Sequence, residues 1–144
     1  MKSTVAPGSD ALWNATGETI EAGREVVIAP STDAQWAELA RQTSAMKRAM
    51  SQLAASPVQV VSKGEKIDGA GVAGTPQAQD IQARIDKNQA EFRAGITAMI
   101  TVLNRYDAAI KARKASDLMD LGGKLDEACE ACHTAFWYPD QKPI

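Results

Sequence analysis

The residues best suited to chemistry lie together near the C-terminus. The chain contains two cysteines and one histidine, and all three fall within the run Cys129-Glu130-Ala131-Cys132-His133. Thiolate and imidazole are the side-chain groups that bind soft and borderline metals. The Cys-x-x-Cys spacing puts the two thiols about one helical turn apart on one side of a helix. These residues form the candidate functional site.

The motif Cys-x-x-Cys-His is the attachment signature of haem c. Each cysteine sulfur forms a thioether bond with one vinyl group of the porphyrin, and thiols one helical turn apart suit that geometry. His133 follows Cys132 directly, which brings its imidazole beneath the ring plane as the proximal ligand of the iron. We therefore expect one covalently bound haem c at Cys129 and Cys132, with His133 as the iron ligand.

Three other interpretations of the motif stay open. A thioredoxin-like redox pair also has the Cys-x-x-Cys spacing, but it opens a helix after a strand, whereas this pair closes a long helical pattern. A structural zinc ion needs four ligands, and the chain has no further Cys or His, so a carboxylate such as Glu130 would have to serve. The third interpretation is two free thiols beside a packed or solvated His133.

Length and charge exclude several classes of function. A chain of 144 residues with 44% hydrophobic content fits one domain spanning residues 1–144. The net charge of −2 gives no basic footprint for nucleic acid, and no run approaches the roughly 18 apolar residues of a membrane span. The first residues lack the apolar core of a secretory signal. We expect either a cytoplasmic protein or a mature form whose targeting segment has been removed.

Apolar residues recur at helical spacing, which predicts an all-α fold without strands or hairpins. We expect a short helix over residues 10–21 capped by Ser9, and a second helix that begins after Thr32 and ends before Pro57. Residues 57–76 form a long surface loop that covers one edge of a cofactor. A helical segment opens at Thr75-Pro76 and breaks near residues 86–88, and the last helix begins near Ser116. These amphipathic helices pack as an antiparallel bundle.

Two features of the helical patterns have more than one interpretation. Met46 and Met50 belong to the apolar stripe of the second helix, where they either fill the core or supply a sixth ligand to iron. Gly122 and Gly123 lie inside the last helix, where each costs up to ~1 kcal/mol relative to Ala. They indicate close approach of the porphyrin or of a neighbouring helix, or else a local kink.

A Cys-x-x-Cys-His motif at the end of the last helix of an all-α chain resembles the class II c-type cytochromes, the cytochrome c′ and cytochrome c-556 group. The segment 112–133 is similar to the final helix of that group, and the likeness fades toward the N-terminus. The resemblance implies an antiparallel four-helix bundle with a haem near one end, a periplasmic location and often a homodimer. Because haem c is attached outside the cytoplasm in bacteria, the resemblance favours the mature-chain interpretation.

The sequence departs from that family on both sides of the haem. Cytochromes c′ commonly carry a basic residue shortly after the haem histidine, whereas residues 134–139 here contain none. Low-spin relatives use a Met of the first helix as sixth ligand, and the predicted first helix has none. The sixth ligand is then Met46 or Met50, a lysine, water or nothing. Trp13 is the bulky residue available to cover the distal face.

The aromatic run after the histidine also has two interpretations. Phe136, Trp137 and Tyr138 either wall the proximal edge of the haem or anchor the C-terminus in the core. We predict that Phe136 and Trp13 pack against the haem as residues of its pocket.

These features predict a periplasmic monohaem cytochrome that transfers electrons to redox partner proteins. The alternative is a haem protein that binds nitric oxide or carbon monoxide at a vacant distal site. We expect no enzyme activity, because a peroxidase ordinarily needs a distal acid-base group and the single His is used on the proximal side. The cluster Lys111, Arg113 and Lys114 either docks an acidic redox partner or complements the C-terminal end of the preceding helix.

Overall fold

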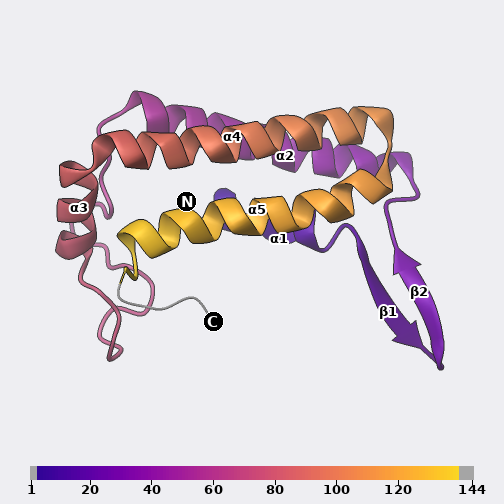
Figure 1. Cartoon of the computed structure of the whole chain (residues 1–144), viewed down its shortest axis with the longest axis horizontal. Coiled ribbons are helices and arrows are strands. Elements are labelled where there is room, and N and C mark those ends of the chain that lie inside the picture. The colour runs from indigo at the N-terminus through magenta and orange to yellow at the C-terminus, as the bar shows by residue number, and fades with distance from the viewer. Residues whose placement is uncertain (1–2, 140–144) are drawn as a thin grey trace.

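The computed structural model describes residues 3–139 and is mostly helical (Figure 1). This part of the chain contains five helices and one two-stranded antiparallel sheet. In chain order the elements are α1 (Val5–Trp13), β1 (Gly17–Glu21), β2 (Arg24–Ile28), α2 (Asp33–Ala55), α3 (Ala78–Lys87), α4 (Gln89–Ala112) and α5 (Ala115–Phe136). No helix within residues 3–139 is long and apolar enough to cross a bilayer.

The start of α2 confirms the predicted cap. The Thr32 Oγ1 accepts a hydrogen bond from the Gln35 N–H at 3.2 Å, and the Gln35 Oε1 accepts one from the Thr32 N–H at 3.0 Å. This reciprocal pair is a capping box, which satisfies two backbone donors that the first turn leaves free. The helix ends at Ala55, before Pro57 as expected.

The predicted break in the third helical segment is also confirmed. α3 ends at Lys87 and α4 begins at Gln89, so that Asn88 lies between two helices of different direction (Figure 1). α4 ends in a left-handed residue, Arg113, with φ of 52°. The Lys114 N–H bonds to the Ala109 carbonyl at 3.0 Å, which turns the chain back into α5.

The long helices surround one apolar core. α4 packs on both α5 and α2, and α1 packs on α2 and α5. Chain direction alternates along this series, since α2 and α5 run opposite to α1 and α4 (Figure 1). The predicted stripes supply the core, whose largest fully buried side chains are Tyr106, Leu12, Met46, Leu103, Leu118 and Leu125.

The prediction of a helix over residues 10–21 with no hairpin is wrong. The helix ends at Trp13, and residues 17–28 form an antiparallel hairpin in which Gly17 pairs with Ile28 and Glu21 with Arg24. Ala22 and Gly23 make the turn with φ of 48° and 76°. Positive φ at both turn positions matches the right-handed twist of the two strands. The hairpin projects from the end of the molecule opposite α3 (Figure 1).

Two predicted helix starts also move. α1 begins at Val5 rather than after Ser9. α3 begins at Ala78 rather than at Thr75-Pro76, and the Asp80 carboxylate accepts from the Gln77 N–H at 3.3 Å. An acidic residue that bonds back to the N-cap amide favours this later start.

The predicted loop 57–76 contains no helix or strand and lies at the same end of the molecule as α3 and the end of α5 (Figure 1). Gln82 of α3 holds its first residues: the Val60 N–H donates to Gln82 Oε1 at 2.9 Å, and Gln82 Nε2 donates to the Val58 carbonyl at 3.1 Å. Val58, Val60 and Ile67 pack against the core. The loop is therefore attached to the molecule near the Cys-x-x-Cys-His motif.

Candidate functional site

Cys129 and Cys132 lie in the last two turns of α5, on the side that packs against the core. Both side chains are half-buried, and neither forms a disulfide. Gly95 of α4 faces Cys132: a Cβ atom placed on Gly95 would lie 3.8 Å from both Cβ and Sγ of Cys132. The missing side chain at Gly95 therefore leaves space in front of this thiol between α4 and α5.

The surroundings keep both thiols protonated. Burial raises the pKa of Cys129 to about 11, with smaller contributions from the charge of Asp126 and from Cys132. Burial also raises the pKa of Cys132, and the charge of Glu91 on α4 adds to the effect. A redox-active Cys-x-x-Cys pair requires the opposite, a pKa lowered by positive groups or a helix N-terminus. The electrostatics therefore argue against the thioredoxin-like interpretation.

His133 is half-buried and lies among aromatic rings. Its ring centroid is 6.1 Å from that of Trp137 and 6.0 Å from that of Tyr138. Across residues 3–139, no hydrogen bond involves the imidazole nitrogens, which leaves them available as ligands. Nor do any three His, Cys, Asp or Glu side chains in these residues gather closely enough to hold a metal ion. This arrangement gives no support to the zinc interpretation, whereas haem attachment does not require the cysteines to bind metal.

Glu130 links α5 to the residues that follow it. Its Oε2 accepts a hydrogen bond from the Tyr138 hydroxyl at 2.6 Å, and its Oε1 accepts one from the Thr134 hydroxyl at 3.1 Å. The bond to Glu130 raises the pKa of Tyr138 to about 12, and the same bond is the main cause of a lowered pKa at Glu130. The Tyr138 ring is thereby held close to His133.

Arg84 of α3 reaches the end of α5. Its Nη1 donates to the carbonyl oxygens of Phe136 at 3.2 Å and Trp137 at 3.4 Å. The Phe136 ring is buried and meets the Phe92 ring of α4 edge to face, with centroids 5.3 Å apart. Phe136 is therefore a core contact between α4 and α5, in the last turn of the helix that carries the motif.

Sequence reasoning missed Arg84, the Tyr138–Glu130 bond and the role of Gly95. Arg84 is 52 positions from its partner Phe136, and no local pattern joins residues so far apart. Tyr138 and Glu130 are eight positions apart, outside the spacing at which side chains of one helix meet. The only available signal was that Gly95 lies on an otherwise regular helical pattern.

Trp13 and Gly122 meet away from the motif. The Trp13 Nε1 donates to the Gly122 carbonyl at 3.2 Å, and a Cβ on Gly122 would lie 3.7 Å from the Trp13 ring. Of the interpretations offered for Gly122, the structure shows close approach of a neighbouring helix, with α5 unbroken. This contact is about two helical turns before Cys129.

Met46 and Met50 are both buried in the core. A Cβ on Gly8 of α1 would lie only 2.6 Å from Cγ and Sδ of Met46, so the Met46 thioether packs directly on the backbone of α1. A larger residue at position 8 would force the Met46 side chain to shift. Binding of Met46 to iron would require it to leave this contact, and Met50, which is 3% exposed, would likewise have to leave the core.

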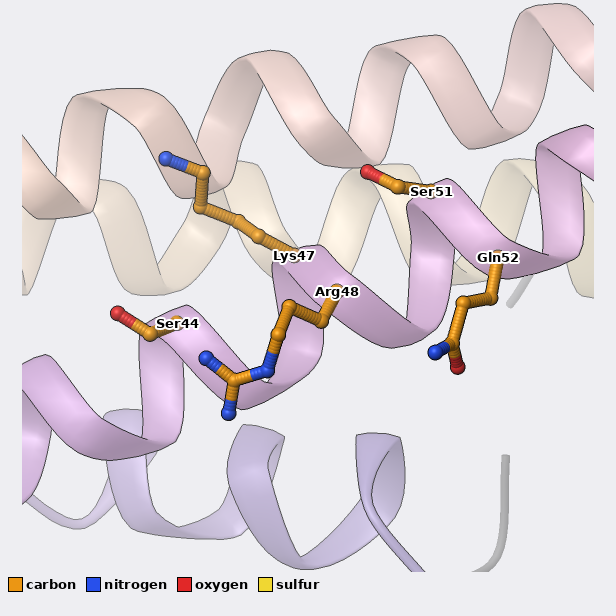
Figure 2. A pocket seen from close by; sticks show the side chains of 5 residues that line it. All are labelled: Ser44, Lys47, Arg48, Ser51 and Gln52. Carbon is orange, nitrogen blue, oxygen red and sulfur yellow. The ribbon is translucent and has the colours of Figure 1, made fainter.

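A depression of the outer surface lies on α2 and is lined by Ser44, Lys47, Arg48, Ser51 and Gln52 (Figure 2). Lys47 extends from α2 toward α4, where its ammonium group is paired with the Asp107 carboxylate. All lining residues come from one helix, and one of the two cations already has a partner.

The residues present fit a covalently attached haem in their chemistry: two unpaired thiols on one face of α5, the side-chain-free Gly95 opposite Cys132, and an imidazole without hydrogen bonds. No protein-family model matches the chain, and no curated protein or solved structure matches it.

Proposed function

We propose that this chain is a class II c-type cytochrome that transfers single electrons through one covalently attached haem. Cys129 and Cys132 would form the two thioether bonds, and His133 would bind the iron. The bound haem would supply an iron ion that alternates between ferric and ferrous states. The observation that carries the proposal is the set of half-buried free thiols one turn apart, followed directly by an imidazole without hydrogen bonds.

The arrangement of the helices supports the class II interpretation. α1, α2, α4 and α5 alternate in direction around one core, as the helices of an antiparallel four-helix bundle do. The motif lies at the end of the last helix, so a haem held there would occupy one end of the bundle. In this proposal the mature protein works in the periplasm, where haem c is attached, either as a monomer or as a homodimer, and its partners are redox proteins.

The side chains around the motif have defined roles in this proposal. Gly95 leaves room beside Cys132, and burial keeps both thiols neutral until they react. Tyr138, held by Glu130, and Trp137 flank the imidazole of His133 and limit its rotation. Phe136 and Phe92 close the contact between α4 and α5 and exclude water from that side.

Expression in a bacterium that exports the chain and attaches haem c tests the proposal. The wild-type chain should retain haem after denaturation, as measured by intact mass and by in-gel haem staining. Cys129→Ala and Cys132→Ala should each lose one thioether bond, which shifts the spectrum of the denatured haem, and the double variant should retain none. His133→Ala should attach haem in lower yield, and the haem that is attached should lack the native spectrum. A wild-type chain that is exported and folded but free of haem would refute the proposal.

The packing of Met46 favours gas binding as a second function. Because its thioether lies against Gly8, one of the two candidate sixth ligands is already engaged in the core. A distal position left without a protein ligand binds carbon monoxide or nitric oxide. A low-spin spectrum with a methionine charge-transfer band supports electron transfer with Met50 as ligand. A high-spin spectrum that shifts on addition of carbon monoxide supports gas binding.

A further inference from the structure

The end of α5 is held by a side chain from another helix. The last carbonyl groups of a helix have no partner within it and need donors from elsewhere. The His133 carbonyl accepts from the N–H groups of Trp137 at 2.7 Å and Tyr138 at 3.0 Å. Further along the chain, the carbonyls of Phe136 and Trp137 accept from the Arg84 guanidinium. The chain around His133 is therefore fixed on both sides.

The position of Arg84 is set by the packing of α3. Ile81 and Ile85, on either side of Arg84 in α3, are both buried in the core. The guanidinium lies in a partly buried position at the end of α5, where α3 stands next to the motif (Figure 1). Arg84 thus differs from a cation on a mobile surface side chain, because buried residues before and after it hold its helix against the core.

A positive charge held at this place has an electrostatic consequence. The C-terminal end of a helix carries a partial negative charge, which a guanidinium compensates. Residues 134–139 contain no basic residue, so Arg84 supplies from α3 the cation next to the chain that follows His133. A nearby fixed cation favours the less positive of two oxidation states, and partial burial weakens its screening by solvent.

We propose that Arg84 is a positioning residue of the haem site, which fixes the end of α5 beside His133 and raises the reduction potential of the iron. This inference rests on the proposed attachment of haem at Cys129 and Cys132. The structure supplies the contact from Arg84 to the Trp137 carbonyl and the contact from the Trp137 ring to His133. Through this path a change at Arg84 reaches the imidazole without touching it.

The test compares three variants of the exported, haem-loaded protein. Arg84→Gln removes the charge and the guanidinium, whereas Arg84→Lys keeps the charge and loses the planar Nη1 group that contacts both carbonyls. Lys87→Gln is the matched control, because Lys87 is an exposed cation of the same helix one turn away. The two measurements are the midpoint potential by redox titration and hydrogen exchange at the Trp137 and Tyr138 amides.

Arg84→Gln should lower the potential enough to change the ferrous-to-ferric ratio at a fixed applied potential roughly threefold or more, the size expected for one partly screened charge. It should also speed exchange of both amides several-fold. Arg84→Lys should speed exchange but keep a potential close to that of the wild type. Lys87→Gln should change neither quantity.

The outcomes separate this inference from the proposed function. A wild-type chain without covalent haem refutes the function, whatever Arg84 does. A haem-loaded Arg84→Gln variant whose potential and exchange match those of Lys87→Gln overturns the role of Arg84 alone. Should Arg84→Gln fail to fold, Arg84→Lys decides: exchange rates equal to the wild type overturn the positioning role, and faster exchange supports it.

Discussion

The hydroxyl group of Tyr106 has no hydrogen-bond partner among the described residues, although the side chain is fully buried. Burial without a partner raises the pKa of Tyr106 to about 12. An unsatisfied buried hydroxyl costs about 1–3 kcal/mol of desolvation, while the ring itself stabilises the core. Tyr106 therefore combines a favourable ring with an unfavourable oxygen.

Tyr106→Phe should raise the free energy of unfolding by about 1 kcal/mol, because it removes the unsatisfied oxygen and keeps the ring. Urea unfolding at pH 7 measures this change. The gain should grow with pH: the native-state pKa is raised, so the wild type keeps its stability below pH 10 and loses it progressively toward pH 12 as the phenol ionises. A loss of stability on removal of the hydroxyl would show instead that this oxygen has a partner.

Substitutions at Gly95 test the space beside Cys132. Gly95→Ala should be tolerated, because its Cβ would make ordinary contacts at 3.8 Å, and it should stabilise α4 by up to ~1 kcal/mol. Gly95→Leu should fill the space in front of the thiol and strongly reduce the yield of covalent haem at equal protein level. In-gel haem staining against total protein measures the ratio. Equal yields for both variants would show that the haem does not approach Gly95.

The hairpin formed by β1 and β2 is the element that was hardest to predict from the sequence. Tight hairpin turns that need positive φ at both positions usually carry Asn-Gly or Asp-Gly, whereas this turn has Ala22-Gly23. Its strands bury little, since Ile20 is 77% exposed and Val27 is 64% exposed, so no alternation of apolar and polar residues marks them. Both of the usual sequence signals for a hairpin are missing.

Ala22→Asn should stabilise this hairpin by about 0.5–1 kcal/mol, because Asn tolerates the left-handed region better than Ala does. Hydrogen exchange at the paired strand residues Thr19 and Val26 should slow several-fold. The melting temperature of the whole protein should hardly change. The two strands pack mainly on each other, and their contacts with the helices are few. An equal gain in global stability would mean that hairpin and core unfold together.

The helices differ in how far sequence could locate them, and the reason is local chemistry. Thr32, Gln35 and the break at Asn88 are short-range signals, so the bounds of α2 and the division between α3 and α4 could be predicted. α1 begins early despite Pro7 and Gly8, two poor helix formers, because Gly8 permits the close contact with Met46. A tertiary contact overrides propensity there.

The candidate site also has residues that local sequence signals identify and residues that only the packing of the helices brings there. Cys129, Cys132 and His133 are marked by spacing alone, which requires no knowledge of the fold. Their supports come from α3, α4 and the residues after α5, through contacts between Arg84 and Trp137 and between Glu130 and Tyr138. These contacts depend on how the helices pack. Sequence could therefore indicate the chemistry of the site but not the side chains that hold it.

The motif and the basic cluster lie at opposite ends of α5 (Figure 1). Lys111, Arg113 and Lys114 surround the turn between α4 and α5, and Lys114 is about 28 Å along the helix axis from His133. Arg113 is already paired with Asp33 of α2 at 2.7 Å. Lys111, in the last turn of α4, complements the negative end of that helix. This arrangement favours the structural interpretation of the cluster over docking.

Neutralising Lys111, Arg113 and Lys114 together should therefore change the rate of electron exchange with an acidic redox partner less than twofold at low salt. A partner docked at this turn would be too far from a haem held at Cys129 and Cys132 for productive transfer. Stopped-flow reduction at two ionic strengths measures the rate. Because the Arg113–Asp33 pair is exposed, its loss should lower stability by less than about 1 kcal/mol. A severalfold, salt-dependent slowing would instead show that this cluster docks the partner. Electrons would then have to leave the protein at the end that carries the hairpin.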